Sequence, residues 1–338
     1  MAFKYKGLRL KDPSLMKKLR QVPLTFTRAS VAYDYKGDAV GVNTPRFQHL
    51  INGVMEYGCL IEEAHTNILP ASQSQSLSEA YTTAALNGTY TFQCEGTGSY
   101  ELSGGATGTV SKDNPVTAAV SSATVTLTPT GTSTLNQILN KAYPLSYTLG
   151  GTTQAAETLN PPTSYLGLTQ GTIECTVIVT PALKTNTAGT YYFLVSTGTI
   201  NDKIQLYKTA GKWAATTRGT STSTISANDT VRVNTTHNIE MTYGVDLSLY
   251  LDGDSIITPL SSPNLPTATA PIYIGSRDAD YQCNGIIKNV TFSAVNYSPS
   301  MIKSRANLSI LSKGFTINKE TKFVAPLTQD LKAYRVRT

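Results

Sequence analysis

The sequence predicts an all-β protein, with two antiparallel β-sandwich or jelly-roll domains in tandem after an N-terminal arm and a small connecting domain. Composition is the first observation, because charged residues make up only 15% and Tyr (19) outnumbers Phe (8), a balance that suits sandwiches with polar outer faces. The second is the alternation of apolar and polar residues in short runs such as 123–128. The third is the turn residues between runs, such as Asp252 and Gly253. A chain of 338 residues is long enough for two or three domains.

Residues 1–22 are predicted to form a basic arm with a short helix over 12–20. Asp12 is suited to cap this helix, and Pro13 to occupy its first position. Residues 1–20 hold seven basic residues against one acidic residue, a net charge of +6. These basic residues are Lys4, Lys6, Arg9, Lys11, Lys17, Lys18 and Arg20. We expect them to dock on an acidic partner surface, with a solvated terminus as the alternative. Nucleic acid is disfavoured, because no recognition motif accompanies the charge.

Residues 23–72 contain three motifs in series, which are LTFTRAS at 24–30, NTPRF at 43–47 and GCLIEEAHTNIL at 58–69. Their order and spacing closely resemble a segment that is common in bacteriophage tail and fibre proteins. Two positions depart from that segment, since Cys59 replaces a Leu and His65 replaces an Arg. The resemblance implies a small connecting or anchoring domain in a virion protein.

The acidic pair of the third motif has a structural and a catalytic interpretation. Glu62 and Glu63 can form ion pairs with Arg28 or Arg46. Adjacent residues on a strand point to opposite faces, so the two carboxylates are poorly placed to act together in catalysis. We therefore expect structural ion pairs here.

A polar linker at 71–78 leads to a series of short, turn-rich strands over 79–150, which predicts a small β-sandwich. In bacteriophage proteins the segment described above is often followed by such a series, which ends in a Gln and a Pro-x-Ser-Tyr motif. Gln137 and the stretch YPLSY at 143–147 resemble this ending. The resemblance covers roughly residues 24–149 and implies a domain similar to carbohydrate-binding modules.

Residues 160–305 carry the pieces of a second sandwich. They include the alternating strand GTIECTVIVT at 171–180, a series of strands over 237–257, PIYIGSR at 271–277 and a helix start at Ser298 and Pro299. The order of these pieces resembles the laminin-G-like, concanavalin A-like jelly-roll family. Residues 306–338 then form a basic β tail. A short hairpin is only marginally stable in water, so we expect this tail to pack on an earlier domain or to join the sheet of a neighbouring subunit.

The chain shows no signature of an enzyme. The nucleophile elbow, the phosphate loop and the zinc motif HExxH are all absent, and only three histidines occur, none near another in sequence. Some glycosidases of concanavalin-like fold place several acidic residues along one strand, whereas Glu174 and Glu240 occur singly on different predicted strands. No catalytic residues are assigned. The chain has no run of 18 apolar residues, which predicts no membrane span, and no apolar export signal near Met1.

No cofactor is required by this sequence, but calcium is one candidate. Asp278, Asp280 and Asn284 resemble the start of a calcium loop, although Cys283 stands where such a loop needs glycine. The resemblance to laminin-G-like domains, some of which hold calcium at the sandwich rim, implies a site at these residues. The alternative is a polar hairpin tip.

Glycan binding requires aromatic rings that stack on sugar faces, with hydrogen-bonding groups nearby. The candidates are Trp213, the only tryptophan, with Tyr207 close to it in the sequence, and Tyr281 near the two aspartates. A single tryptophan in a sandwich is also a common core residue, so Trp213 has two interpretations.

These features predict a non-enzymatic bacteriophage virion protein, assembled in the host cytoplasm and released by lysis. The first hypothesis is a tail-fibre, baseplate or receptor-binding component that contacts host-surface carbohydrate and other virion proteins. A head fibre or capsid decoration protein is the alternative, and a polysaccharide depolymerase is a second one. Fibre proteins are commonly trimeric, so a homo-oligomer is expected, but the sequence does not fix the number of subunits.

Overall fold

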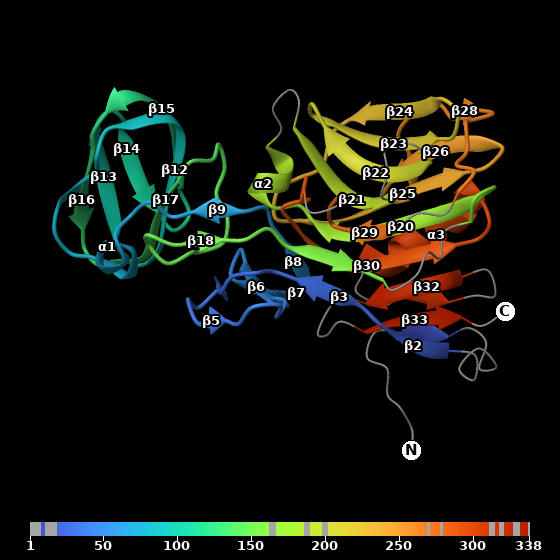
Figure 1. Ribbon diagram of the computed structural model, residues 1–338, viewed down its shortest axis with the longest axis horizontal. Coiled ribbons are helices and arrows are strands. Elements are labelled where there is room, and N and C mark those ends of the chain that lie inside the picture. Colours follow the sequence, from blue (N-terminus) through green and yellow to red (C-terminus); the bar gives the residue numbers. More distant parts are fainter. Residues whose placement is uncertain are drawn as a thin grey trace, which may run out of the picture. The chain divides into compact units, whose positions relative to one another are not determined.

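The computed structural model describes residues 8–10, 19–161, 167–185, 190–197, 202–268, 271–277, 280–310, 315–317, 321–326 and 332–336, with side chains only between 24 and 305 (Figure 1). The chain divides into two compact units. Unit 1 comprises Met1–Thr27, Pro45–Glu62 and Glu157–Thr338, and unit 2 comprises Arg28–Thr44 and Glu63–Ala156. Strands dominate both units, so the predicted all-β class is confirmed.

Unit 2 is a sandwich of two four-stranded antiparallel sheets. The first has the order β10 (Ser76–Leu77), β17 (Ser133–Leu139), β12 (Leu86–Gly96), β15 (Val116–Ala123). The second has the order β11 (Tyr81–Thr82), β16 (Val125–Thr130), β13 (Ser99–Gly104), β14 (Gly108–Ser111). The unit also holds the pairs β4 (Ala32–Tyr33) with β5 (Ala39–Val40) and β9 (His65–Thr66) with β18 (Thr153–Gln154), and the short helix α1 (Ala71–Gln75).

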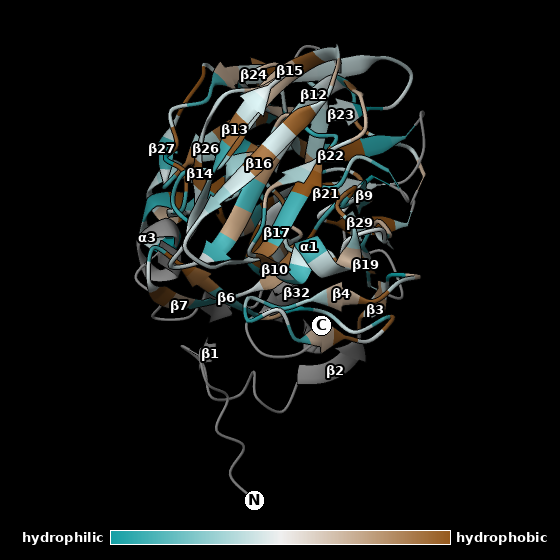
Figure 2. Ribbon diagram, turned by 90° about the vertical axis from the view of Figure 1, so that its left-hand side faces the viewer, coloured by the Kyte–Doolittle hydropathy of each residue, from teal (hydrophilic) through white to brown (hydrophobic). Residues whose placement is uncertain are grey.

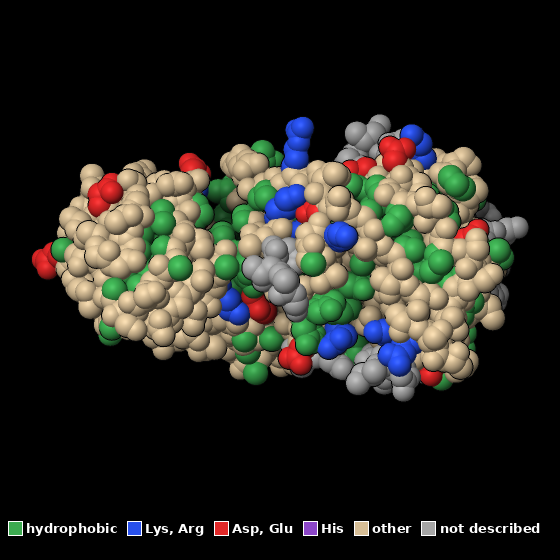
Figure 3. All heavy atoms as spheres, turned by 90° about the horizontal axis from the view of Figure 1, so that it is seen from above, with side chains coloured by type: hydrophobic (Ala, Val, Ile, Leu, Met, Phe, Trp, Pro, Cys, Tyr) green, Lys and Arg blue, Asp and Glu red, His purple; other side chains and the backbone are tan. Residues whose placement is uncertain are grey.

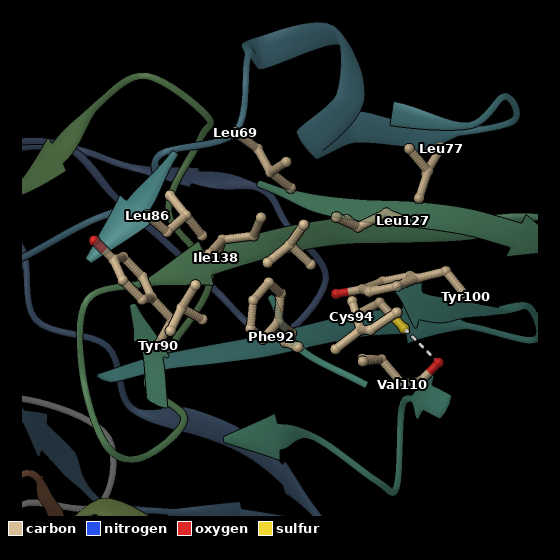
Figure 4. Close-up of a cluster of buried hydrophobic side chains, with 14 residues drawn as sticks. Leu69, Leu77, Leu86, Tyr90, Phe92, Cys94, Tyr100, Val110, Leu127 and Ile138 are labelled. Atoms are coloured by element: carbon tan, nitrogen blue, oxygen red, sulfur yellow. Dashed lines mark hydrogen bonds between the residues drawn. The ribbon is translucent and has the colours of Figure 1, made fainter. Parts of the chain in front are cut away.

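The core of unit 2 is formed by apolar side chains from both of its sheets (Figure 4). Bands of hydrophobic and hydrophilic residues alternate along its strands, as the two-residue period of a strand requires (Figure 2). Phe92 of β12 and Tyr100 of β13 are completely buried. Between them lies Cys94, whose thiol donates to the Val110 carbonyl at 4.0 Å. Burial raises the pKa of the Cys94 thiol to about 11, so Cys94 is a packing residue.

Unit 1 contains a seven-stranded and a ten-stranded sheet. The seven-stranded sheet has the order β24 (Thr222–Asn228), β23 (Lys212–Arg218), β22 (Lys203–Thr209), β21 (Tyr191–Thr197), β29 (Ile272–Ile274), β19 (Thr158–Asn160), β3 (Thr25–Thr27). The main path of the other is β2 (Leu19–Pro23), β33 (Lys332–Val336), β32 (Thr321–Pro326), β30 (Gly285–Ser293), β20 (Gly171–Ile178), β25 (Thr236–Tyr243), β26 (Asp246–Leu251), β27 (Asp254–Ser255). Here β28 (Leu260–Ser261) pairs with β26, and β8 (Cys59–Ile61) with β30.

Smaller elements complete the described part of unit 1. They are the parallel pair β1 (Leu8–Leu10) and β31 (Phe315–Ile317), the hairpin β6 (Gln48–Ile51) and β7 (Val54–Tyr57), and the helices α2 (Pro181–Lys184) and α3 (Pro299–Ile310). Helix α3 begins at the predicted proline, and the Ser298 hydroxyl accepts a hydrogen bond from the Met301 amide at 3.4 Å. None of the described helices has the length and apolar character needed to cross a bilayer.

The two-residue period of the strands divides each sheet of unit 1 into two faces. On the ten-stranded sheet, Ile173 and Cys175 of β20 are completely buried on the core side, as predicted for this strand. On the seven-stranded sheet, Leu206 of β22 and Trp213 of β23 are completely buried on the core side. We call the opposite face of the seven-stranded sheet, which carries Tyr207, the outer face.

The chain ends differ from the expectation for the arm. Leu19 and Arg20, predicted to close a helix, belong to β2 and pair with Val336 and Arg335 of β33. Backbone pairing within the sheet satisfies these residues in place of a helical turn; residues 11–18 of the predicted helix lie outside the described residues. The C-terminal tail packs on its own chain, because β32 pairs with β30.

The two units group the chain differently from the five predicted segments. Residues 23–72 are shared between both units, because the chain passes from unit 1 to unit 2 between Glu62 and Glu63. It returns to unit 1 at Glu157. The strands β8 and β3 from this stretch pair within the two large sheets of unit 1.

Candidate binding site

Four aromatic side chains gather on the outer face of unit 1. This aromatic cluster consists of Tyr191 and Phe193 of β21, Tyr207 of β22, and Tyr281, which follows β29. The Phe193 and Tyr207 rings stack with centroids 5.0 Å apart, and the Tyr191 and Tyr281 rings lie edge to face at 6.0 Å. Phe193 and Tyr207 are buried, whereas Tyr191 and Tyr281 are 38% and 40% exposed. The cluster therefore has a buried base and two accessible rings.

Strand register brings these rings together. Phe193 lies directly opposite Tyr207 in the β21–β22 ladder, and the register shifts after Phe193. Tyr281 has a φ of 57°, a backbone conformation that is uncommon for a side chain of this size. The Phe193 amide donates to the Tyr281 carbonyl at 3.3 Å, which holds this strained residue against β21. Sequence reasoning named Tyr207 and Tyr281 but not Tyr191 or Phe193, although the run of three aromatic residues at 191–193 was a visible signal.

Three basic side chains adjoin the aromatic cluster. The Arg277 guanidinium lies 4.2 Å from the centroid of the Tyr281 ring and 5.5 Å from that of Phe193. Lys203 of β22 and Arg218 of β23 are directly opposite in the sheet register. Burial lowers the pKa of Lys203, and the positive charges of Arg218 and Arg277 lower it further. We call Lys203, Arg218 and Arg277 the cation cluster.

The rest of the outer face is rich in hydroxyl and amide groups. The Tyr207 hydroxyl is 3.1 Å from that of Thr216, which is 2.8 Å from the Thr224 hydroxyl. The Gln205 amide donates to the Ser196 hydroxyl at 3.0 Å. These bonds fix the orientation of polar groups beside the rings, as a ligand site with directional hydrogen bonds requires. Seen from above, the described surface is mostly tan, the colour of the backbone and of side chains that are neither hydrophobic nor charged (Figure 3).

Trp213 does not belong to this surface. Its side chain is completely buried, its indole NH donates to Asp229 at 3.1 Å, and the Lys208 ammonium lies 5.8 Å from its ring centroid. The proposed role as a sugar platform is therefore wrong, because no face of the ring is accessible. The alternative interpretation as a core residue is the one that the structure supports.

The predicted calcium ligands do not form a common site among the described residues. Asp278 lies outside them. The Asp280 side chain is exposed, whereas Asn284 is buried and its carbonyl accepts a hydrogen bond from the Thr180 hydroxyl. The described part of the chain contains no group of three or more His, Cys, Asp or Glu side chains placed to hold a metal ion. No role is assigned to calcium in this protein.

The predicted docking residues lie largely beyond what the structure describes. Five of them, Lys4, Lys6, Lys11, Lys17 and Lys18, are outside the described residues. Arg9 lies in β1 and Arg20 in β2, where only the backbone is described. Their role in docking stays a prediction.

Glu174 and Glu240, expected to be isolated on separate strands, are direct partners in the β20–β25 register. Both are buried under α3, where Arg305 Nε donates to Glu174 at 2.9 Å and the side-chain amide of Asn238 donates to Glu240. Burial, followed by the negative charge of Glu174, raises the pKa of Glu240 well above 4.5. This is a carboxylate pair that the sequence did not reveal, but α3 covers it.

A second group has the residue types of a catalytic triad, a hydroxyl, an imidazole and a carboxylate. It consists of Thr235, His237 and Asp252. The His237 ring lies 2.8 Å from the Thr235 hydroxyl and 2.7 Å from the Asp252 carboxylate. The Thr235 hydroxyl, however, donates its proton to the Arg232 carbonyl at 2.6 Å. Asp252 also accepts from the backbone N–H of Asn238 at 2.8 Å, so the group holds the turn between β26 and β27 against β25.

The motifs at 43–47 and 58–69 form internal networks. Arg46 donates to Glu62 at 3.0 Å and to Glu157 at 2.7 Å, and all three side chains are buried. Glu63 instead pairs with Lys141 at 3.1 Å, in unit 2. The expected structural role of the two glutamates is thus confirmed, with Lys141 as a partner that the sequence did not suggest.

The motif residues near the end of the 24–149 segment also contact one another. The buried Gln137 amide donates to the carbonyls of Leu145 and Ser146 at 3.2 and 3.1 Å. Asn67 is completely buried and donates to the Asn136 and Thr148 carbonyls at 3.0 and 2.8 Å. These polar motif residues therefore satisfy buried backbone groups of unit 2.

No protein-family model and no curated protein matches the chain. The structure is distantly similar to jelly-roll domains that bind carbohydrates or receptors. The CBM40 domain of the Ruminococcus gnavus sialidase, bound to α2,3-sialyllactose, matches with a TM-score of 0.34 and 20% identity over 41% of this chain and 83% of that domain. The botulinum neurotoxin serotype D binding domain matches with a TM-score of 0.37 and 11% identity over 46% of this chain and 40% of that one.

A bacteriophage protein is also among the similar structures. Full-length tailspike protein 2 of Escherichia coli O157:H7 bacteriophage CAB120 matches with a TM-score of 0.41 and 12% identity, over 52% of this chain and 26% of that chain. This chain thus spans about a quarter of the tailspike. At these identities the likeness concerns the fold alone.

Proposed function

We propose that this chain is a non-enzymatic bacteriophage virion protein, a tail-fibre, baseplate or receptor-binding component, and that it binds host-surface glycans through the aromatic cluster. One observation carries the binding role: Tyr191 and Tyr281, 38% and 40% exposed, stand on a buried aromatic base at a polar sheet face. Sugar rings present apolar CH faces and polar edges, and this surface offers matching groups for both.

The two exposed rings are held in place before any ligand arrives. Tyr191 packs on Phe193 and Tyr207, and Tyr281 lies between Tyr191 and the Arg277 guanidinium. A ring that is already ordered loses little side-chain entropy on binding, so more of the stacking energy contributes to affinity. This preorganisation supports a binding surface over a disordered patch of exposed apolar residues.

Substitution of the exposed rings tests the binding role. Tyr281→Ala and Tyr191→Ala should each weaken binding of host-surface glycan fragments by at least about tenfold, because each removes one stacking surface. The measurement is isothermal titration calorimetry after a glycan-array screen of the full chain. Tyr57→Ala is the matched control, since Tyr57 is also 38% exposed but lies on β7. Equal binding by all variants and the wild-type chain would refute the proposed site.

The virion assignment rests on the resemblance of residues 24–149 to a segment of bacteriophage tail and fibre proteins. Antibody labelling of particles should mark the tail tip for a tail component and the shell for a head fibre or decoration protein. Deletion of residues 1–20 should reduce incorporation into particles, most strongly at low salt, because salt screens the attraction of the basic arm. Unchanged incorporation would refute the docking role, and absence of the chain from particles would refute the virion assignment. Its homo-oligomeric state, including a trimer, stays a prediction.

The depolymerase alternative has a specific candidate in Glu174 and Glu240. Their burial under α3 and the pairing of Glu174 with Arg305 argue for a structural role. Incubation with host polysaccharide should therefore release no reducing ends. Release that is abolished by Glu174→Gln or Glu240→Gln would establish the enzyme instead.

A further inference from the structure

We infer that the outer face selects glycans that carry a carboxylate group, such as uronic or nonulosonic acids, and that Lys203, Arg218 and Arg277 bind this group. The inference rests on the proposed glycan-binding function and adds the chemical class of the ligand. It starts from the position of the three basic side chains, all of which are half-buried.

The cation cluster lies on the same face as the aromatic cluster. Lys203 and Tyr207 are four residues apart on β22, so their side chains point to the same side, separated by roughly 13 Å along the strand. Arg218 is directly opposite Lys203 in the register. Arg277 joins the two clusters, because its guanidinium stacks on Tyr281 at 4.2 Å while its charge acts on Lys203. One oligosaccharide can therefore reach both clusters.

The cation cluster lacks a negative partner among the described side chains. No ion pair of Lys203, Arg218 or Arg277 with a carboxylate occurs there. Two described carboxylates lie nearby. Asp202, next to Lys203, accepts hydrogen bonds from the Thr267 amide and hydroxyl at 2.6 and 2.9 Å. The exposed Asp280 is bridged to Arg277 through the backbone of both residues. The buried Lys208, on the same strand as Lys203, by contrast pairs with Asp229 at 2.8 Å.

This arrangement is unfavourable without a ligand. Like charges directly opposite in a sheet destabilise it, and Arg218 Nε is buried without a hydrogen-bond partner in the described structure. A ligand carboxylate would reduce the repulsion and accept charge-assisted hydrogen bonds from these donors, and a guanidinium can bind it through two nitrogens. The shared chemistry is a carboxylate on a sugar ring, beside which Tyr281 and Tyr191 provide stacking.

The test compares matched acidic and neutral saccharides by calorimetry with the full chain. One pair is trigalacturonate and its methyl ester, and the other is 3′-sialyllactose and its methyl ester. We expect at least one acidic member to bind about tenfold tighter than its neutral partner, with an affinity that falls as ionic strength rises. The two pairs separate a uronic acid from a nonulosonic acid as the source of the carboxylate.

Charge-removing variants then identify the residues. Lys203→Gln and Arg218→Gln should each remove most of the preference for the acid, while Lys203→Arg, which keeps the charge, should retain it. Lys212→Gln is the matched control, because Lys212 is an exposed residue at the other end of β23 and should change nothing. Circular dichroism confirms that each variant is folded.

The outcomes separate the two proposals. Equal affinity for acidic and neutral members, abolished by Tyr281→Ala, would overturn the carboxylate inference and leave glycan binding intact. A preference for acid that survives Lys203→Gln and Arg218→Gln would also overturn it. Absence of binding to any saccharide on the array would overturn the proposed function, and with it this inference.

Discussion

Each of the two large sheets of unit 1 places two like charges opposite each other on the face that points away from the core, but the surroundings of the two pairs differ. On the ten-stranded sheet, the like-charged residues Glu174 and Glu240 are direct partners in the register. Helix α3 covers them, Arg305 pairs with Glu174, and burial with charge repulsion raises the pKa of Glu240. On the seven-stranded sheet, Lys203 and Arg218 are direct partners, and no described carboxylate pairs with them.

The difference shows how a cluster of charges with a structural role can be distinguished from a cluster of charges that binds a ligand. Repulsion on the covered face is relieved within the chain, by a helix that brings a counter-charge and by the raised pKa of Glu240, which favours its neutral form. Repulsion on the open face is left for an external anion to relieve, next to two exposed aromatic rings. Four experiments break or sharpen this comparison.

Removal of the counter-charge from the covered face should have the largest effect. Arg305→Met leaves Glu174 buried without its cation, which should lower the free energy of unfolding by about 3–5 kcal/mol. The measurement is urea denaturation followed by fluorescence. Lys303→Met, on the same helix, is the control, because Lys303 forms only an exposed ion pair with Asp254 and should change stability little. Equal losses in both variants would show that Arg305 does not neutralise a buried charge.

The pH dependence of stability tests the protonated partner. The folded state keeps the Glu240 proton above pH 4.5, its ordinary value, whereas the unfolded chain releases it. Glu240 therefore contributes fully to the free energy of unfolding below pH 4.5. This contribution is lost as the pH rises through the raised pKa of Glu240, at up to about 1.4 kcal/mol per pH unit. Wild-type protein should lose stability relative to Glu240→Gln between pH 4.5 and neutrality. Asp254→Asn is the exposed control, and parallel curves for wild type and Glu240→Gln would contradict the raised pKa.

A stability measurement on the open face should separate binding from folding. Tyr281→Ala should weaken glycan binding by about tenfold, equivalent to roughly 1.4 kcal/mol, yet shift the unfolding midpoint by less than Arg305→Met does. The Tyr281 ring is partly exposed to solvent, so its removal costs little buried contact. Alanine does not relieve the strain of the φ of 57°, because it also has a Cβ atom. A loss of stability as large as that of Arg305→Met would show that Tyr281 is a core residue.

The smallest expected effect is a gain of stability. Lys203→Gln removes one of two opposed positive charges and should stabilise the free protein by about 0.2–1 kcal/mol, with a smaller gain at high salt. Thermal unfolding at two ionic strengths measures it, and Lys212→Gln serves again as the control. A destabilised Lys203→Gln protein would mean that Lys203 has a favourable partner.

The sequence by itself determined the fold class and the character of its elements. Alternation in GTIECTVIVT at 171–180 predicted β20, and Ser298 with Pro299 predicted the start of α3, because strand period and helix capping depend on neighbours in the chain. It also supplied Tyr207 and Tyr281 as ring candidates and a structural role for Glu62 and Glu63.

Only the tertiary structure decided which of these residues meet. Trp213 and Tyr207 lie on adjacent strands, but one ring is buried in the core and the other faces outward, since strand alternation assigns them to opposite faces. The pairing of Lys203 with Arg218 and of Glu174 with Glu240 depends on register, which is set by the whole sheet and its turns. Local sequence encodes the faces of a strand, whereas the partners on each face come from strands that are distant in the chain.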